Sequence, residues 1–185
     1  MKDDASNGST TGMSFPGKTY FLKMRGGAQV PPRSTLRTVA LAWLGGFIAI
    51  AAVGSMTAAT HEMLVLGSFG ATCVLIFGFP ESPFSQPRNV IGGHFLSSLT
   101  GLTFFYFLGP QWWSMALALA TAIALMQLTR TVHPPAGSNP LIVFISAAPW
   151  NFLITPTLLG AAILVLIAVA YNNLASERRY PQYWI

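Results

Sequence analysis

Six stretches of apolar residues alternate with short polar stretches along most of this chain. The apolar stretches cover residues 36–60, 63–80, 90–108, 112–129, 141–148 and 152–171. About 20 apolar residues in a helix are needed to cross the roughly 30 Å hydrocarbon layer of a membrane. The pattern therefore predicts an all-α integral membrane protein with about six transmembrane segments, four long and two short or broken.

The short stretch 141–148 cannot cross the membrane alone as a helix, because eight residues are too few. We expect the crossing to include irregular backbone from 134–140. Such backbone survives at membrane depth where protein or a water-filled cavity satisfies its polar groups, so the break indicates a cavity. If the segment were re-entrant, five crossings would place Arg178 and Arg179 outside, against the positive-inside rule. Six crossings keep both termini and the basic segment ends cytoplasmic.

Composition excludes a soluble domain, since 52% of the residues are hydrophobic and only 8% are charged, against about 25% in soluble proteins. The formal net charge is +5, but the basic residues lie at segment ends, where they set membrane orientation. We therefore expect the lipid bilayer as a partner and no nucleic acid. In a bacterium the location would be the plasma (inner) membrane. The single cysteine, Cys73, lies in an apolar stretch and is expected to be a small packed side chain.

Three regions follow from this pattern. Residues 1–35 are basic and rich in small polar side chains, and they predict a largely disordered cytoplasmic tail without a secretory signal. Residues 36–175 form the transmembrane domain. Residues 176–185 are expected to be a cytoplasmic C-terminal tail.

Two proline-rich polar motifs interrupt the apolar pattern, at 79–94 and 130–140. Proline breaks helices and leaves free N–H groups at the start of the helix that follows. In the six-crossing arrangement both motifs fall on the same side of the membrane. The residues that we expect to shape these breaks are Pro80, Pro83, Pro87, Gly92, Gly93, Pro134, Pro135 and Gly137.

The polar residues of the motifs suit a small anion. Arg88 and Asn89 are expected to precede the third helix, and Ser138 and Asn139 the fifth, so that capping side chains and helix dipoles act together. The candidate substrate-binding residues are Glu81, Ser82, Ser85, Arg88, Asn89, His94, Arg130, His133, Ser138 and Asn139. The alternative is that both motifs are plain cytoplasmic turns whose arginines obey the positive-inside rule.

Enzymatic chemistry finds little support in the sequence. His61 and Glu62 begin an HExxH-like pattern, but Val65 stands where the second zinc ligand would be. No Ser-His-Asp set can be assigned, because the chain has three histidines and five acids, two of them in the tail. We expect no catalytic residues, no metal site and no cofactor, and we expect that the protein is not an enzyme.

The motifs closely resemble the HPP family of small integral membrane proteins. The resemblance rests on 67–71 (GSFGA), 80–83 (PESP), 86–94 (QPRNVIGGH) and 133–137 (HPPAG), and it covers roughly residues 36–175. Family members in plastids and cyanobacteria are associated with nitrite transport. The resemblance thus implies a transporter or channel for a small inorganic anion, with nitrite as the first substrate to test. The family is usually described with four spanning helices, whereas the pattern here predicts six.

The leading hypothesis is therefore anion transport, with Glu81, His94 and His133 as candidates for proton coupling. The alternative is a non-transporting membrane scaffold or accessory subunit whose motifs bind a partner protein. Six thin helices of about 20 kDa can hardly enclose a full translocation path, so we expect a homo-oligomer.

Overall fold

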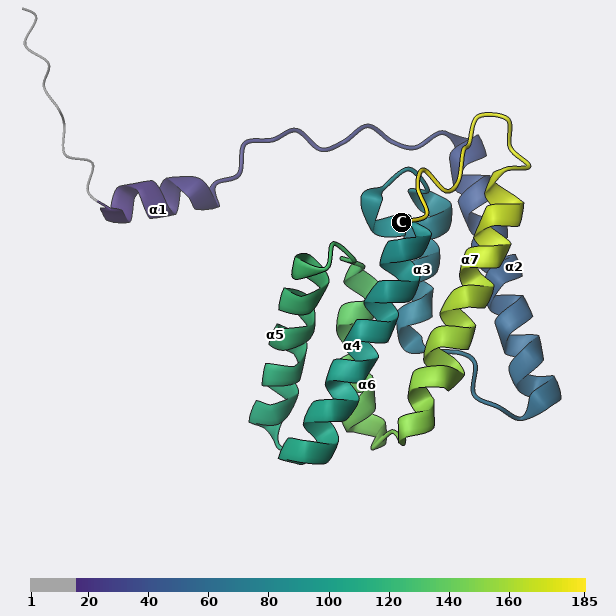
Figure 1. Ribbon diagram of the computed structural model, residues 1–185. Coiled ribbons are helices and arrows are strands. Elements are labelled where there is room, and N and C mark those ends of the chain that lie inside the picture. The colour runs from purple at the N-terminus through teal and green to yellow at the C-terminus, as the bar shows by residue number, and fades with distance from the viewer. Residues whose placement is uncertain (1–15) are drawn as a thin grey trace, which may run out of the picture. The chain divides into compact units, whose positions relative to one another are not determined.

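The computed structural model describes residues 16–185 of the chain, with side chains from Tyr20 onward. These residues form helices and turns without any strand, as predicted (Figure 1). The helices are α1 (Pro16–Met24), α2 (Leu36–Thr60), α3 (Gly67–Gly78), α4 (Pro87–Leu108), α5 (Trp112–Leu128), α6 (Asn139–Ser146) and α7 (Leu159–Asn172). Four single turns lie between them: η1 (Pro83–Ser85), η2 (Pro134–Ser138), η3 (Trp150–Leu153) and η4 (Ile154–Leu158).

The region 1–35, expected to be largely disordered, contains the helix α1. Pro16 occupies its first position, where proline is best tolerated, and Lys23 lies in its last turn, where a cation complements the helix dipole. Nine residues of the region predicted to be largely disordered are therefore helical. Residues 1–15 lie outside the described part of the chain.

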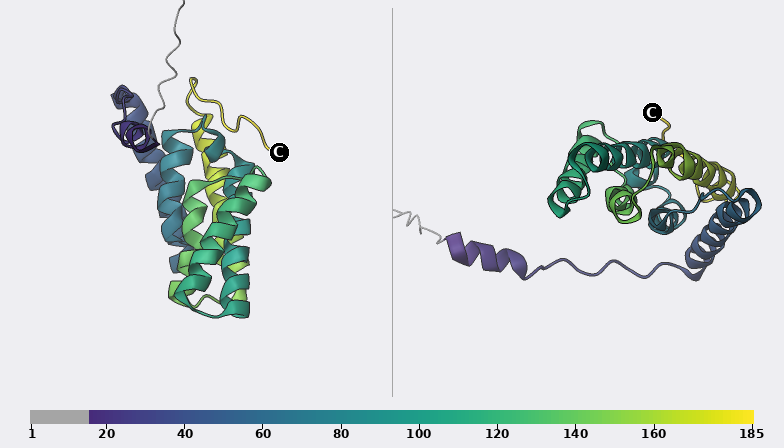
Figure 2. Two further views of the ribbon diagram at one scale, coloured as in Figure 1. Left: turned by 90° about the vertical axis from the view of Figure 1, so that its left-hand side faces the viewer. Right: turned by 90° about the horizontal axis from the view of Figure 1, so that it is seen from below.

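The remaining helices form one bundle within residues 34–185. Its longer helices stand in a curved row in the order α5, α4, α7, α2, and the short helices α3 and α6 lie against the concave side of that row (Figure 2). This arrangement confirms the prediction of four long and two short segments. It also places α6 next to α4, the segment that carries much of the first motif, whereas α3 packs against α2 and α7.

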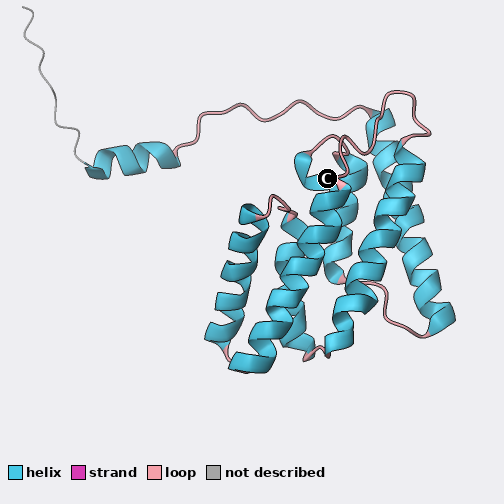
Figure 3. Ribbon diagram, viewed as in Figure 1, coloured by secondary structure: helices cyan, strands magenta, loops and turns pink. Residues whose placement is uncertain are grey.

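Both proline-rich motifs lie at the same end of the bundle, together with the start of α2 and the end of α7 (Figure 1). We call this the motif end. The connections α2–α3, α4–α5 and α6–α7 lie at the opposite end (Figure 3). Helix α6 runs away from the motif end and α7 returns to it, so the chain alternates as six crossings require.

Within residues 16–185, three helical segments are long and apolar enough to cross a membrane by length and composition: Leu36–Thr60, Pro87–Leu108 and Trp150–Asn172. Helix α3 is shorter than the predicted stretch 63–80, because Pro80 disfavours helical backbone at Phe79, and residues 61–66 are not helical. Its 12 residues span about 18 Å at 1.5 Å per residue. Irregular backbone therefore covers the rest of this crossing.

The last segment is also less regular than the conventional helix predicted for 152–171. It begins with η3 and η4, and Thr155 has extended backbone angles (φ −126°, ψ 115°) within η4. This agrees with Pro156, since the ring of a proline disfavours helical angles at the residue before it. Regular helix starts only at Leu159.

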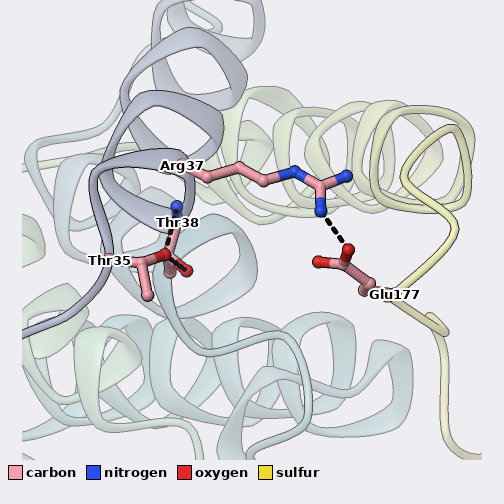
Figure 4. Close-up of polar contacts among 4 residues, drawn as sticks. All are labelled: Thr35, Arg37, Thr38 and Glu177. Carbon is pink, nitrogen blue, oxygen red and sulfur yellow. Dashed lines mark hydrogen bonds and ion pairs between the residues drawn. The ribbon is translucent and has the colours of Figure 1, made fainter.

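The C-terminal residues 176–185 pack over the first motif, although the sequence indicated a simple tail. Tyr180 is only 1% exposed, and its hydroxyl donates to the Ser85 carbonyl oxygen at 2.7 Å. Burial raises the pKa of this phenol above its ordinary value. Farther back in this segment, Glu177 forms an ion pair with Arg37 at the start of α2 (Figure 4). The C-terminal segment is therefore part of the structure of the motif end.

The small residues of α3 and α4 have different roles. On α4, Gly93, Ser97 and Gly101 recur every four residues and are buried, and a Cβ added at Gly101 would lie 2.8 Å from the Pro140 Cα. This face serves packing inside the bundle. On α3, Gly67, Gly70 and Ala71 are exposed, and nothing lies within 4 Å of a Cβ added at either glycine. The α3 face is therefore free to contact lipid or another chain.

Candidate functional site

The prolines of the two motifs start helical elements rather than merely ending them. Pro83, Pro87 and Pro134 are the first residues of η1, α4 and η2, where the missing N–H group has no helical partner to lose. Pro135 is the second residue of η2, and Gly137 lies within the same turn. The motifs are thus ordered turns that determine where the helical elements after them begin.

Polar side chains of the first motif are used to close the turn after α3. The Ser85 Oγ donates to the carbonyl oxygens of Leu75 at 3.1 Å and Phe79 at 2.7 Å. The Gln86 Nε2 donates to those of Pro80 at 2.9 Å and Ser82 at 2.8 Å. Ser85 is therefore committed to the protein backbone rather than open to a ligand.

Ser82 has a similar structural contact, since its Oγ accepts a hydrogen bond from the Phe84 N–H at 3.3 Å. Glu81 is exposed at the motif end. Of the three first-motif residues that we expected to meet substrate before α4, Glu81 alone makes no side-chain hydrogen bond among the described residues.

The second motif lies along α4 and is held there by side chains of α4. The donors are Arg88 Nη2 to the Thr129 carbonyl at 2.9 Å, Asn89 Nδ2 to the Val132 carbonyl at 2.9 Å, and Ser97 Oγ to the Ala136 carbonyl at 2.6 Å. Prolines supply no N–H groups here, so carbonyls of the second motif accept from side chains, and the Ala136 carbonyl also accepts from the Asn139 N–H. The two motifs, far apart in the sequence, are therefore in direct contact, as their position on one side predicted.

Glycine permits this contact. A Cβ added at Gly93 would lie 2.7 Å from the His133 Cβ and 2.9 Å from the Thr131 carbonyl oxygen, and one added at Gly92 would lie 3.0 Å from the Thr131 Cγ2. Distances below 3.0 Å are not tolerated between such atoms without movement. The GG pair of α4 thus allows the second motif to reach the helix backbone.

The expected capping roles are wrong. Helix α4 begins at Pro87, so Arg88 and Asn89 lie inside its first turn, and its N-cap residue Gln86 makes no side-chain cap bond. Ser138 precedes α6 but donates instead to the Pro135 carbonyl at 2.9 Å. In α6, Pro140 is the second helical residue and lacks one of the N–H groups that a cap would bind, whereas Pro87 is the first residue of α4 and removes none of them.

Arg88 and Arg130 are far apart in the sequence but are brought close by the contact of Arg88 with the Thr129 carbonyl. Their environments differ. Arg88 is half-buried, and its Nε is buried without a partner in residues 16–185. Arg130 is exposed and has a positive φ of 57°, directly after the Thr129 carbonyl that Arg88 contacts. Arg88 therefore offers a buried N–H donor, whereas Arg130 contributes charge at the surface.

Four buried side chains meet where α3, α4 and the second motif pack together. The Thr72 Oγ1 of α3 lies 3.0 Å from His94 Nε2 of α4 and 2.9 Å from His133 Nε2. The Asn139 Nδ2, at the start of α6, lies 3.0 Å from His94 Nδ1. The His133 Nδ1 lies 2.7 Å from the Phe84 carbonyl oxygen of η1. His94, His133 and Asn139 were expected at one site, and the structure brings them together.

The row of polar groups continues past Asn139. Its Nδ2 lies 2.8 Å from Ser98 Oγ, which lies 3.0 Å from the Thr157 Oγ1 of η4. We call this set the polar chain: Thr157, Ser98, Asn139, His94, Thr72 and His133. All six side chains are fully buried. Polar and ionisable side chains inside membrane segments are rare and usually mark function, so the polar chain is the principal candidate site.

Sequence reasoning missed Thr72, Ser98 and Thr157. Each is a hydroxyl inside an apolar stretch, where a helix can satisfy it by an internal carbonyl contact. Because a hydroxyl can bond within its own helix, its presence in the sequence does not indicate a contact with another helix. Thr72 lies one residue beyond the GSFGA stretch of 67–71, and this proximity was the one available signal.

A cavity opens at each end of the bundle. At the motif end a cavity of about 460 Å³ is lined by residues that include Arg37, Glu81, Arg178 and Arg179. At the opposite end a cavity of about 420 Å³ is lined by residues that include Gly67, Thr155 and Pro156. Helix α3 contacts the second cavity with its first residue and the first cavity with its last residue, Gly78. Thr72, in the middle of α3, therefore lies between them.

These features define a helical integral membrane protein with a buried polar interior. The chain belongs to the HPP family, because the family described as "HPP, transmembrane region" matches residues 31–181. This confirms the resemblance found in the sequence.

Two relatives from Dictyostelium discoideum, both called only "transmembrane protein", are similar over most of the chain. One is 36% identical over 177 residues, covering 89% of this chain and 57% of the relative. The other is 38% identical over 179 residues, covering 89% of this chain and 63% of the relative. The chain thus spans about three fifths of the length of these relatives. No solved structure matches it.

Proposed function

We propose that this HPP-family protein is a transporter or channel for a small inorganic anion, with nitrite the first substrate to test. The observation that carries the proposal is the buried, unpartnered Nε of Arg88 at the contact between the two motifs. Leaving a buried charged donor without a partner costs about 1–3 kcal/mol or more. A small anion would supply the missing acceptor and the opposite charge.

Charges around the motif-end cavity support the same function. Three arginines and two glutamates line it, which gives a net charge of 3 − 2 = +1. Arg178 is fixed there by contacts to the Phe77 carbonyl at 3.0 Å and the Asn172 Oδ1 at 2.9 Å. A cation at the end of α3 also complements the negative end of the helix dipole. The cavity is therefore suited to collect anions from the side of the motif end.

The direct test is uptake by purified protein in proteoliposomes. Nitrite, nitrate, formate and chloride are compared with and without a pH gradient, against liposomes that lack protein. We expect saturable nitrite entry that exceeds chloride entry, because a site with few directional donors discriminates by size and hydration. If none of the four anions enters faster than into empty liposomes, the proposal is wrong, and stable co-purification of a partner protein would favour the scaffold alternative.

We also propose that the protein is a homo-oligomer. The non-helical residues 61–66 include exposed backbone, and Gly67, Gly70 and Ala71 of α3 expose a small-residue face directly after them. Polar backbone is not tolerated against lipid, and small residues allow close helix contacts. Light scattering in mild detergent should therefore give a mass of two or more 19.9-kDa chains. A protein mass equal to one chain would contradict this.

A further inference from the structure

The hydrogen bonds of the polar chain have one direction. The Asn139 amide group facing His94 must be the nitrogen, because it also lies 3.4 Å from the His94 carbonyl, which can only accept. His94 Nδ1 is therefore an acceptor, and the proton of the neutral ring is on Nε2. That N–H donates to Thr72 Oγ1 at 3.0 Å.

The other end of the row is fixed in the same way. The Phe84 carbonyl can only accept, so His133 carries its proton on Nδ1 and presents a bare Nε2 to Thr72. The Thr72 hydroxyl, already accepting from His94, has two acceptors within reach: His133 Nε2 at 2.9 Å and the Ser68 carbonyl oxygen of its own helix at 3.2 Å. The shorter contact makes Nε2 the acceptor of its proton. The two histidines are thus held as opposite tautomers, and three successive hydrogen bonds point from His94 toward Phe84.

We propose that His94, Thr72 and His133 form a proton relay, which rests on the proposed function by naming the proton as the coupled ion. One proton binds His94 Nδ1 as the Nε2 proton passes to Thr72. The Thr72 proton passes to His133 Nε2, and the Nδ1 proton of His133 passes to a water molecule, because a carbonyl oxygen does not take up a proton. One proton enters and one leaves. The two hydrogen bonds at Thr72 then point the other way, and the bare His133 Nδ1 no longer bonds to the Phe84 carbonyl, which can only accept. A second passage in the same direction requires that the groups reorient first.

Asn139 is placed to control the entry of protons. An amide does not pass protons readily, and its N–H covers the His94 Nδ1. After a transfer, His94 would carry its proton on Nδ1 and need an acceptor. The Asn139 Oδ1 is buried and has no partner among the described residues. Rotation of the amide by a half turn would bring this oxygen to His94, so Asn139 fits both directions of the relay.

Polar groups extend from the relay toward each end of the bundle. Phe84 belongs to η1 at the motif end and is exposed. On the other side, the polar chain continues through Ser98 to Thr157, which follows Pro156 in the wall of the opposite cavity. The relay therefore occupies the middle of a row of buried polar groups that extends toward both surfaces.

The tautomers can be measured without any transport. The chain has three histidines, so side-chain ¹⁵N NMR of the full protein in bilayers gives three assignable rings, and a His61→Gln variant identifies the exposed one. At neutral pH we expect the proton of His94 on Nε2 and that of His133 on Nδ1. The same tautomer in both rings would overturn the proposal.

Proton movement is tested by a potassium gradient with valinomycin across liposomes that contain a pH-sensitive dye. Thr72→Val keeps the side-chain shape but removes the hydroxyl, and we expect it to lower proton flux by at least about tenfold, as loss of a positioned proton donor does. Thr72→Ser should restore most of the flux. Thr100→Val is the matched control, since the buried Thr100 hydroxyl contacts only the Leu96 carbonyl of its own helix.

The outcomes separate this proposal from the proposed function. Nitrite uptake with proton flux that does not depend on Thr72 would overturn the relay and leave anion transport intact. Proton flux that needs the Thr72 hydroxyl, without uptake of any anion, would support the relay and reject anion transport. A wild-type protein that passes no protons overturns the relay, and equal tautomers would do so even if Thr72→Val failed to fold.

Discussion

Replacement of Gly93 by valine is expected to prevent the two motifs from packing and to abolish recovery of folded protein. The first added carbon alone would lie 2.7 Å from the His133 Cβ and 2.9 Å from the Thr131 carbonyl oxygen. Both neighbours are held, because His133 donates to the Phe84 carbonyl and residues 129–136 are tied to α4 by three side-chain bonds. The second motif would therefore have to leave α4.

Gel filtration and thermal unfolding in detergent provide the measurement. Gly93→Ala should give an intermediate result, since overpacking costs about 1–3 kcal/mol and each kcal/mol lowers the melting temperature of a chain this size by roughly 2–4 °C. Gly54→Val in α2 is the matched control, because nothing lies within 4 Å of a Cβ there. If Gly93→Val and Gly54→Val were equally stable, the close contact at Gly93 would not be needed for folding.

The segments of this fold could be predicted because each depends on local sequence. The length of an apolar stretch sets whether it can cross a membrane, and a proline determines where a helix starts or stops. Those two facts gave six segments and the common side of both motifs. They failed in detail where proline acts on its preceding residue, as at Phe79 and Thr155.

The contacts of the site could not be predicted because they join residues far apart in the sequence. Thr72 bonds to residues 22 and 61 positions later, and no periodicity encodes such a pair. The C-terminal segment shows the same limit, since Tyr180 bonds to a carbonyl 95 positions earlier. The sequence indicated which histidines and asparagine belong to the site but not the hydroxyl groups that connect them.

Residue type alone also misjudged what the motif side chains do. Serines, asparagines and arginines were expected to face an anion, yet Ser85, Asn89 and Ser138 donate to backbone carbonyls. A helix broken by proline exposes carbonyls, and inside a membrane protein these must find donors before any ligand does. Polar side chains near a helix break therefore donate first to the carbonyl groups that the break exposes. Only a donor without such a partner, such as the Arg88 Nε, is available to a substrate.

Reversal of the charge at Arg88 is accordingly expected to abolish nitrite uptake in proteoliposomes. The guanidinium is half-buried, is held by the Thr129 carbonyl and keeps one buried N–H without a partner. A hydrogen bond to a charged group contributes about 1.5–3 kcal/mol, which corresponds to a roughly 10–150-fold loss of affinity. Arg88→Glu adds repulsion of the anion, so we expect at least the upper part of that range, while Arg88→Lys retains the charge and part of the activity.

Arg130→Glu is the matched control, with the same change of charge next to the carbonyl that Arg88 contacts. Because Arg130 is exposed, its effect acts through water and should be small at about 0.15 M salt and larger at low salt, where the screening length is greater. The effect of Arg88→Glu should change little with salt, since its site is partly buried. Thermal unfolding of both variants shows whether lost uptake reflects lost structure. Uptake by a stable Arg88→Glu protein at the wild-type rate would contradict an anion site at Arg88.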